Sequence, residues 1–371
     1  MQLTCETKLL RQSLQAAVKI IKKDGLAKLR AKDGMLEIET AEQPEFVSAR
    51  FKAEIDTEGE CIVNPALLSE LMNRLEDSCV VLTTIKGKDG KDSLLQIHYN
   101  LEKDETAKAE LHISQDSTMV DIPKLVPEKS IEFLKSDFDT LLRKVIFASS
   151  KSETKLCSVN FLFEDGALFA NATDKHIIAQ KKVTCKAEDG FEVVVPTNIL
   201  NQILAIRTGE KAMVKMDIQS NLIRFEIGNI TLINQLIDTK FPPVKRAIPA
   251  ADDYDVKITI NKGEALKAIN RLSVFNKQNE PLVLNIEDGK VILTTKTVIG
   301  GLKENIAYKN ETNTETCKVG LNTNYLVNII NSIEAEDVEI KWRQANTQRL
   351  LFEDSKDKNV RYVLSPVRLS A

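Results

Sequence analysis

The sequence is poor in the residues that build metal centres, disulfide frameworks and aromatic binding surfaces. Its 371 residues include three histidines, six cysteines and one tryptophan, and aromatic residues make up only 5%. The cysteines show no Cys-x-x-Cys spacing and no partnering histidine pair, so neither a zinc site nor a set of disulfides is suggested. We expect reduced core thiols, no metal site and no cofactor.

Long apolar runs are also absent. No segment approaches the length that crosses a membrane, and Glu6 and Lys8 stand where a signal peptide needs apolar residues. Hydrophobic residues at 43% and charged residues at 28% are still enough for packed cores. The length then predicts two or three globular domains, and we expect a cytoplasmic location.

The chain has no large excess of charge of either sign. It carries 51 Lys and Arg against 54 Asp and Glu, a formal charge of −3. A chain with this balance is not expected to bind nucleic acid over its whole surface. Any contact with DNA must therefore come from a local basic face.

What the sequence does contain is a hairpin that recurs at about a third of the chain length. An Asp-Gly turn between apolar strands occurs in Lys32–Thr40, Glu164–Thr173 and Glu287–Thr295. An amphipathic helical pattern precedes each hairpin, and a short strand, a turn and a second helix follow it. These helical segments are Lys8–Ile21, Phe138–Ala148 and Glu264–Phe275, followed by the units Cys61–Leu75, Glu192–Ile206 and Cys317–Ile333.

The repeat predicts an α+β fold of three tandem copies of one domain, each with two helices packed on antiparallel sheets. Proline-containing linkers at 121–128 and 241–253 place the domains near 1–127, 128–250 and 251–371. Basic residues gather on the helical segments, whereas acidic residues crowd the turns and strands. This segregation favours a positive helix face that contacts phosphates without reading sequence, although any single lysine is more often simply solvated. The expected DNA-facing residues are Lys19, Lys22, Lys23, Arg143, Lys144, Lys151, Lys267 and Arg271.

Three separated segments resemble signature motifs of one family, the bacterial replicative sliding clamps, which are beta subunits of DNA polymerase III. Ala172–His176 resembles the family's Ala-Thr-Asp-Gly-His-Arg-Leu, and Leu236–Pro242 resembles its Leu-Val-Asp-Gly-Arg-Phe-Pro. The C-terminal Tyr362–Leu369 resembles its Tyr-Val-Val-Met-Pro-Met-Arg-Leu. The resemblance covers all three predicted domains, and the motifs occur in the family's order.

The resemblance implies a DNA polymerase processivity factor without enzymatic activity. Two subunits would close head to tail into a homodimeric ring that encircles duplex DNA and slides along it. By the same matching, the ring-closing interface would contain Val274 and Phe275. No motif marks the partner surface, for which we choose Leu111 and Ile113.

The resemblance also implies a peptide groove between the second and third domains. It would take short motifs with apolar and Gln residues from DNA polymerase, the clamp loader and repair proteins. Its expected residues are Thr173, Lys175, His176, Ile177, Ile178, Pro242, Arg246, Ala247, Val363, Ser365, Pro366, Val367, Arg368 and Leu369.

The chain departs from the family's motifs inside that groove. Lys175 replaces the usual Gly, Ile177 replaces Arg, and Ser365 and Val367 replace the two Met residues. Loss of both methionines removes adaptable apolar surface and predicts an altered motif preference. The divergence leaves an alternative function open, a clamp-like peptide-binding scaffold that does not encircle DNA. An enzyme is not expected, because His176 has no nucleophile-elbow sequence near it, and we assign no catalytic residue.

Overall fold

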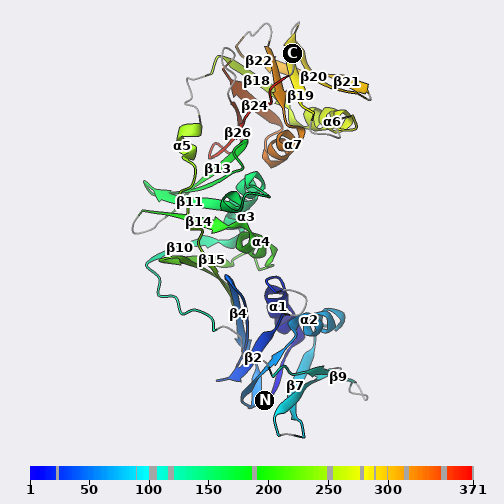
Figure 1. Cartoon of the computed structure of the whole chain (residues 1–371), viewed down its shortest axis with the longest axis vertical. Coiled ribbons are helices and arrows are strands. Elements are labelled where there is room, and N and C mark those ends of the chain that lie inside the picture. The colour runs from blue at the N-terminus through cyan, green and yellow to red at the C-terminus, as the bar shows by residue number, and fades with distance from the viewer. Residues whose placement is uncertain are drawn as a thin grey trace. The chain divides into compact units, whose positions relative to one another are not determined.

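The computed structural model of the chain describes residues 1–21, 25–88, 90–99, 107–115, 121–185, 190–248, 254–275, 280–287, 290–298, 300–312, 317–343 and 349–369. The chain divides into two compact units. Figure 1 labels their helices and strands and colours them by residue number. Unit 1 combines Met1–Phe138 with Asn198–Leu236, and unit 2 combines Asp139–Thr197 with Ile237–Ala371. No helix within the described ranges is long and apolar enough to cross a membrane.

Unit 1 is built from two antiparallel sheets. One has the strand order β5-β1-β7-β8-β9, and the other has the order β10-β15-β16-β17-β4-β3-β2-β6. The elements are β1 (Gln2–Glu6), α1 (Thr7–Val18), β2 (Ala27–Lys32), β3 (Met35–Glu42), β4 (Glu45–Lys52), β5 (Glu54–Thr57), β6 (Gly59–Val63), α2 (Pro65–Arg74), β7 (Cys79–Lys86), β8 (Asp92–Tyr99), β9 (Ala107–His112), β10 (Lys129–Leu134), β15 (Met213–Gln219), β16 (Leu222–Ile227) and β17 (Ile230–Gln235).

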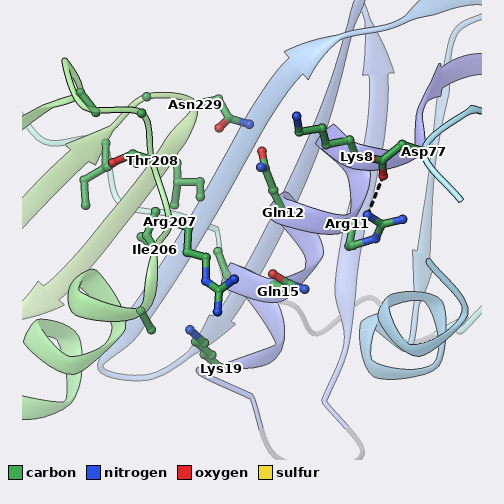
Figure 2. Close-up of a pocket in the computed structure, with 17 residues that line it drawn as sticks. Lys8, Arg11, Gln12, Gln15, Lys19, Asp77, Ile206, Arg207, Thr208 and Asn229 are labelled. Atoms are coloured by element: carbon green, nitrogen blue, oxygen red, sulfur yellow. Dashed lines mark hydrogen bonds and ion pairs between the residues drawn. The ribbon is translucent and has the colours of Figure 1, made fainter. Parts of the chain in front are cut away.

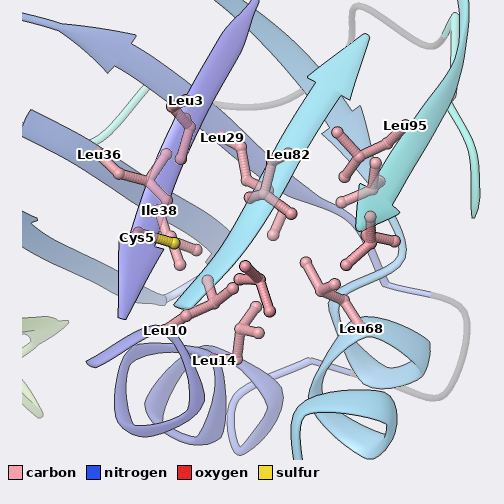
Figure 3. Close-up of a cluster of buried hydrophobic side chains, with 14 of the residues drawn as sticks. Leu3, Cys5, Leu10, Leu14, Leu29, Leu36, Ile38, Leu68, Leu82 and Leu95 are labelled. Carbon is pink, nitrogen blue, oxygen red and sulfur yellow. The ribbon is translucent and has the colours of Figure 1, made fainter. Parts of the chain in front are cut away.

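The core of the first repeat lies between these sheets and helices α1 and α2 (Figure 3). Leu10 and Leu14 of α1 and Leu68 of α2 are fully buried against the strands. Burial raises the pKa of the core thiols Cys5 and Cys61 to about 12, so both stay protonated at neutral pH. The expectation of core thiols is confirmed for these two and for the buried Cys317, whereas Cys157 and Cys185 are half-buried and Cys79 is exposed.

Unit 2 is also built from two antiparallel sheets, of order β14-β11-β12-β13-β26-β25-β24-β18-β22 and β21-β20-β19-β23. Helices α3 (Lys135–Val145) and α4 (Thr197–Ala205) begin near the points where the chain passes between units. The other elements are two 3₁₀ turns (Ile146–Ala148 and Thr154–Leu156), β11 (Ser158–Glu164), β12 (Ala167–Thr173), β13 (Ile177–Thr184), β14 (Phe191–Pro196), α5 (Val244–Ala247), β18 (Val256–Asn261), α6 (Lys262–Leu272), β19 (Leu282–Glu287), β20 (Lys290–Thr297), β21 (Gly300–Ile306), β22 (Tyr308–Asn310), β23 (Cys317–Leu321), α7 (Thr323–Ser332), β24 (Asp337–Trp342), β25 (Leu350–Asp354) and β26 (Val360–Leu364).

The α+β prediction is confirmed, with few helices packed on antiparallel sheets. Both described Asp-Gly turns adopt the positive φ that the hairpin requires. Asp33 and Gly34 have φ of 53° and 71°, and Asp165 and Gly166 have φ of 51° and 72°. The third predicted turn, at 288–289, lies outside the described residues, but β19 and β20 pair on either side of it.

Sheets run continuously from one repeat into the next. Strand β17 of the middle repeat pairs with β4 of the first, and β13 of the middle repeat pairs with β26 of the third. The two compact units therefore divide the middle repeat between them. The division into three domains stays a prediction.

Candidate functional site

The polar turn between β12 and β13 is fixed by its own side chains. The Thr173 hydroxyl donates to the Ile177 carbonyl at 2.7 Å and accepts from the Lys175 amide at 3.0 Å. Asp174 Oδ1 accepts from the amides of His176 and Ile177 at 2.9 and 3.0 Å. These bonds hold Lys175 at a φ of 81°, in the left-handed region. The turn is therefore a preformed surface.

Helix α7 also stabilises this turn, through a hydrogen bond from Tyr325. Tyr325 donates its phenolic hydrogen to Asp174 Oδ2. Burial, together with this hydrogen bond to Asp174, raises the pKa of Tyr325 to about 12. The phenol thus remains a hydrogen donor at physiological pH. Asn322, the N-cap of α7, accepts from the amides of Asn324 and Tyr325 and so sets where that helix begins.

A cavity of about 330 Å³ opens beside the turn, and we call it the groove. The turn, α5, the end of β26 and the residue before β25 contribute its walls, all within unit 2. The lining residues are Thr173, Lys175, His176, Ile178, Pro242, Pro243, Val244, Arg246, Ala247, Arg349, Val363 and Ser365.

Most of the predicted groove residues come together here, but five do not line the cavity. Ile177 is fully buried, because strand alternation turns it to the face opposite Ile178. The prediction for Ile177 is therefore wrong. Pro366, Val367, Arg368 and Leu369 do not line the groove either, because the chain beyond Ser365 bends towards β23.

The C-terminal tail docks on a glycine. Val367 pairs with Gly320 of β23, and its amide donates to the Gly320 carbonyl at 2.8 Å. A Cβ on Gly320 would lie 2.7 Å from both the Val367 carbonyl oxygen and Leu369 Cδ2. The glycine therefore permits an approach that no other residue would allow.

Replacing Gly320 with alanine is expected to displace this tail and to lower the free energy of unfolding by about 1–3 kcal/mol, as overpacking does. Carboxypeptidase trimming followed by mass spectrometry, beside chemical unfolding, would report both effects. Gly209→Ala is the matched control, because a Cβ there meets nothing within 4 Å. Equal trimming of the Gly320→Ala variant and the wild type would contradict this account of the tail.

Sequence reasoning missed Pro243, Val244 and Arg349 in the groove. The segment 241–247 already carried Pro242, Arg246 and Ala247, so its position in the family motif could have indicated the first two. Nothing in the local pattern pointed to Arg349, which reaches the groove from the third repeat. Its Nη1 donates to the Ala247 carbonyl at 2.9 Å.

A second and larger cavity, of about 850 Å³, lies in unit 1 and we call it the basic pocket (Figure 2). Its lining comes from α1 and the adjacent Lys19, from Asp77, from residues 205–209 and 227–230, and from Ala212. Its cations are Lys8, Arg11, Lys19 and Arg207. Asp77, the acidic residue in the described lining, pairs with Arg11 at 2.7 Å.

Lys19 and Arg207 approach one another in the basic pocket although both carry positive charge. Partial burial, followed by repulsion from Arg207, lowers the pKa of Lys19. Figure 2 shows the two side chains at the same end of the pocket, away from the Arg11–Asp77 pair. No acidic residue of the described lining lies between these two cations, an arrangement that suits an anionic ligand.

Comparison with known proteins identifies the family to which the chain belongs. Residues 132–243 match the family model of the DNA polymerase III beta subunit, central domain, and residues 245–368 match that of its C-terminal domain. The chain belongs to the bacterial DNA polymerase III beta sliding clamp family. Members of this family are processivity factors and not enzymes.

Individual relatives are distant. A beta sliding clamp of Staphylococcus epidermidis is 25% identical over 253 residues, which cover 67% of this chain and 66% of that protein, just under two thirds of its length. A DNA polymerase III beta subunit from Thermotoga maritima is 18% identical, with a TM-score of 0.89 over the whole of both chains. A sliding clamp from Bacillus subtilis is 20% identical, with a TM-score of 0.87 over both chains. These solved structures show that the fold is shared along the entire chain.

The cations predicted to face DNA differ in their exposure and in whether they form ion pairs. Lys22 and Lys23 lie outside the described residues. Lys19 lines the basic pocket, and Arg143, Lys151 and Lys267 are exposed. Arg271 is also exposed, but it forms a two-pronged ion pair with Glu304 at 2.6 and 3.0 Å, which offsets its charge.

Lys144 requires a correction. Its side chain is only 8% exposed, and its Nζ donates to the Ser332 carbonyl at 2.6 Å. The same Nζ pairs with Glu334 at 2.8 Å and lies 3.9 Å from Asp354. Lys144 therefore connects α3 with the end of α7. Its ammonium is buried and already paired with carboxylates, so it is not available to contact a phosphate.

The residues predicted at the clamp's dimer interface lie beside open sheet edges. Val274 follows α6 and is 60% exposed. Phe275 is half-buried, and its ring lies 3.3 Å from the point that a Cβ on Gly300, at the start of β21, would occupy. Strand β21 is the terminal strand of its sheet. Leu111 and Ile113 pack against the first-repeat core at β9, a terminal strand in unit 1.

Proposed function

We propose that the chain is a DNA polymerase processivity factor that acts as a homodimeric ring around duplex DNA. The observation that carries this proposal is the likeness of its fold to sliding clamps over the full length of both chains. Sheets continue from one repeat to the next, and two copies of the chain would close the ring. Such a factor would act in the cytoplasm.

The ring would close where the terminal strands β9 and β21 meet across subunits. Each is the terminal strand of its sheet and pairs on its outer side with no other strand of the described chain, so that side could accept strand addition. Val274 and Phe275 from one subunit would cover Leu111 and Ile113 of the other. This is a heterologous contact that closes after two copies.

Affinity for DNA would come from topology, because a closed ring cannot leave the duplex sideways. Lysines and arginines such as Lys19 and Arg207 then need only weak, mobile phosphate contacts that permit sliding. The groove would hold peptides of the polymerase, the clamp loader and repair proteins. The Pseudomonas aeruginosa sliding clamp, of the same fold, has been solved bound to griselimycin.

The test is primer extension on primed circular single-stranded DNA with the cognate polymerase, clamp loader and ATP. Addition of the protein should lengthen the product of a single binding event from tens to thousands of nucleotides. Product lengths unchanged by the protein would contradict the proposal.

The alternative is a clamp-like scaffold that binds peptides without encircling DNA. The burial of Lys144 and the ion pair of Arg271 favour it, because each removes a cation that the ring was expected to present to DNA. The basic pocket favours the ring, since Lys19 and Arg207 line it and form no ion pair with any residue that the structure describes. We therefore retain the ring as the proposal.

Replacing both Lys19 and Arg207 with glutamine is expected to weaken duplex binding and flatten its salt dependence. Two phosphate contacts contribute roughly 1.8 to the slope of log affinity against log salt, at about 0.9 each. Fluorescence anisotropy with a 30-base-pair duplex from about 50 to 200 mM salt would measure it. Lys32→Gln with Lys52→Gln, an exposed pair elsewhere in unit 1, is the matched control. An unchanged slope would remove the basic pocket from the DNA-binding surface.

A further inference from the structure

The rim of the groove carries charge of one sign. Among the described residues that line it, Lys175, Arg246 and Arg349 are cations and none is acidic. Lys175 is offset by Glu153, whose carboxylate lies 2.6 Å from Nζ. Arg246 and Arg349 form no ion pair within the described part of the chain. Among the residues that the structure describes, neither guanidinium group has a counter-ion.

Arg349 is held in a fixed position. Its Nη1 donates to the carbonyl of Ala247, the last residue of α5, at 2.9 Å, and the residue is half-buried. A guanidinium has five N–H donors in a planar fork, so one bond to a carbonyl orients the group and leaves other donors available. A carboxylate can accept two of those donors in parallel. Arg349 is thus organised in advance to bind a carboxylate.

The apolar part of the groove is small. Val363 is buried and Ile178 half-buried, and Ser365 stands where the family's motif has methionine. A serine offers less apolar contact than a methionine and adds a hydroxyl. Recognition in this groove consequently depends more on polar contacts than on a deep apolar anchor.

We propose that the groove selects peptides in which an aspartate or glutamate side chain lies next to an apolar anchor, and that Arg349 is the residue that binds this carboxylate. This inference rests on the proposed peptide-docking function and defines its partner. The carboxylate belongs to a side chain within the peptide. The cations come from three separate elements around the rim, the turn, α5 and the residue before β25, which suits a segment that crosses the groove.

The test uses a pair of fluorescein-labelled decapeptides made of glutamine, leucine, phenylalanine and glycine. They are blocked at both ends and differ by one aspartate-to-asparagine replacement beside the leucines. Anisotropy with the full chain should show the aspartate peptide binding roughly tenfold more tightly, as expected for a charge-assisted bidentate contact. Arg349→Gln should reduce that preference to about twofold or less, and Arg349→Lys should leave it intermediate.

The matched control is Arg361→Gln, which removes an exposed arginine of β26 that does not line the groove. It should keep the full preference, whereas a loss equal to that of Arg349→Gln would show a general charge effect and overturn the role of Arg349. Equal binding of the two peptides by the wild type would overturn the inference while leaving peptide docking intact. A preference that appears only when the peptide C-terminus is left free would assign the carboxylate to a chain end and overturn it too. Failure of both peptides to bind, at micromolar protein, would count against the docking function itself.

Discussion

Replacing Asp354 with alanine is expected to lower the free energy of unfolding of unit 2 by about 3–5 kcal/mol, the cost of breaking a buried charged network. The Asp354 side chain is fully buried. It accepts hydrogen bonds from the amides of Glu334, Ala335 and Lys356 at 2.6, 3.2 and 3.0 Å, and the Lys144 ammonium lies 3.9 Å away. Alanine would leave three amides without their acceptor and one buried cation short of a counter-charge.

The measurement is urea unfolding followed by the fluorescence of Trp342, the single tryptophan of the chain. Trp342 is fully buried on β24, and its indole nitrogen donates to Cys317 Sγ at 3.1 Å, so it reports on the same sheet. The control is Glu334→Gln, which removes a carboxylate that also pairs with Lys144 but is 56% exposed. It should cost less than about 1 kcal/mol. Equal losses for the two variants would show that Asp354 is not the centre of the network.

Replacing Val274 with aspartate is expected to weaken the homodimer at least 100-fold. The Val274 side chain is 60% exposed in the single chain and follows α6, which packs beside the terminal strand β21. Closing the proposed interface over a carboxylate would bury an unpaired charge. A loss of about 2.7 kcal/mol in the free energy of dimerisation is enough to weaken the dimer 100-fold.

Sedimentation equilibrium between nanomolar and micromolar concentration would measure the change. Val126→Asp makes the same substitution at another exposed valine, which is 71% exposed and lies on neither β9 nor β21. This control should dimerise like the wild type. If the Val274→Asp variant also dimerised with wild-type affinity, β21 and the end of α6 would not form the ring-closing contact.

The sequence predicted local structure well because local structure depends on neighbouring residues. The Asp-Gly turns at 33–34 and 165–166 were identifiable from two residues that tolerate positive φ between apolar strands. The helix that follows Asn64 was identifiable because the Asn64 side chain caps it and Pro65 occupies its first turn.

Features that depend on distant parts of the chain were not predictable. Lys144 has the spacing of a solvated helix residue, and its burial depends on residues near 332 and 354 that only the fold brings to it. Arg349 reaches the groove for the same reason. The error at Ile177 is different, since alternation along β13 could have separated it from Ile178. The continuity of sheets between repeats also gives no local signal, because pairing partners on an open edge are not encoded in either strand alone.

The measurement that tests the central claim most directly is retention on circular DNA. Labelled protein would be loaded onto a nicked plasmid with the cognate clamp loader and ATP, separated from free protein in near-physiological salt, and followed before and after one restriction cut. A topological ring predicts that the protein stays on the circle and is lost over the linear ends. Equal retention on circles and linear DNA, or a protein that remains monomeric and never loads, would contradict the ring and support the non-encircling scaffold.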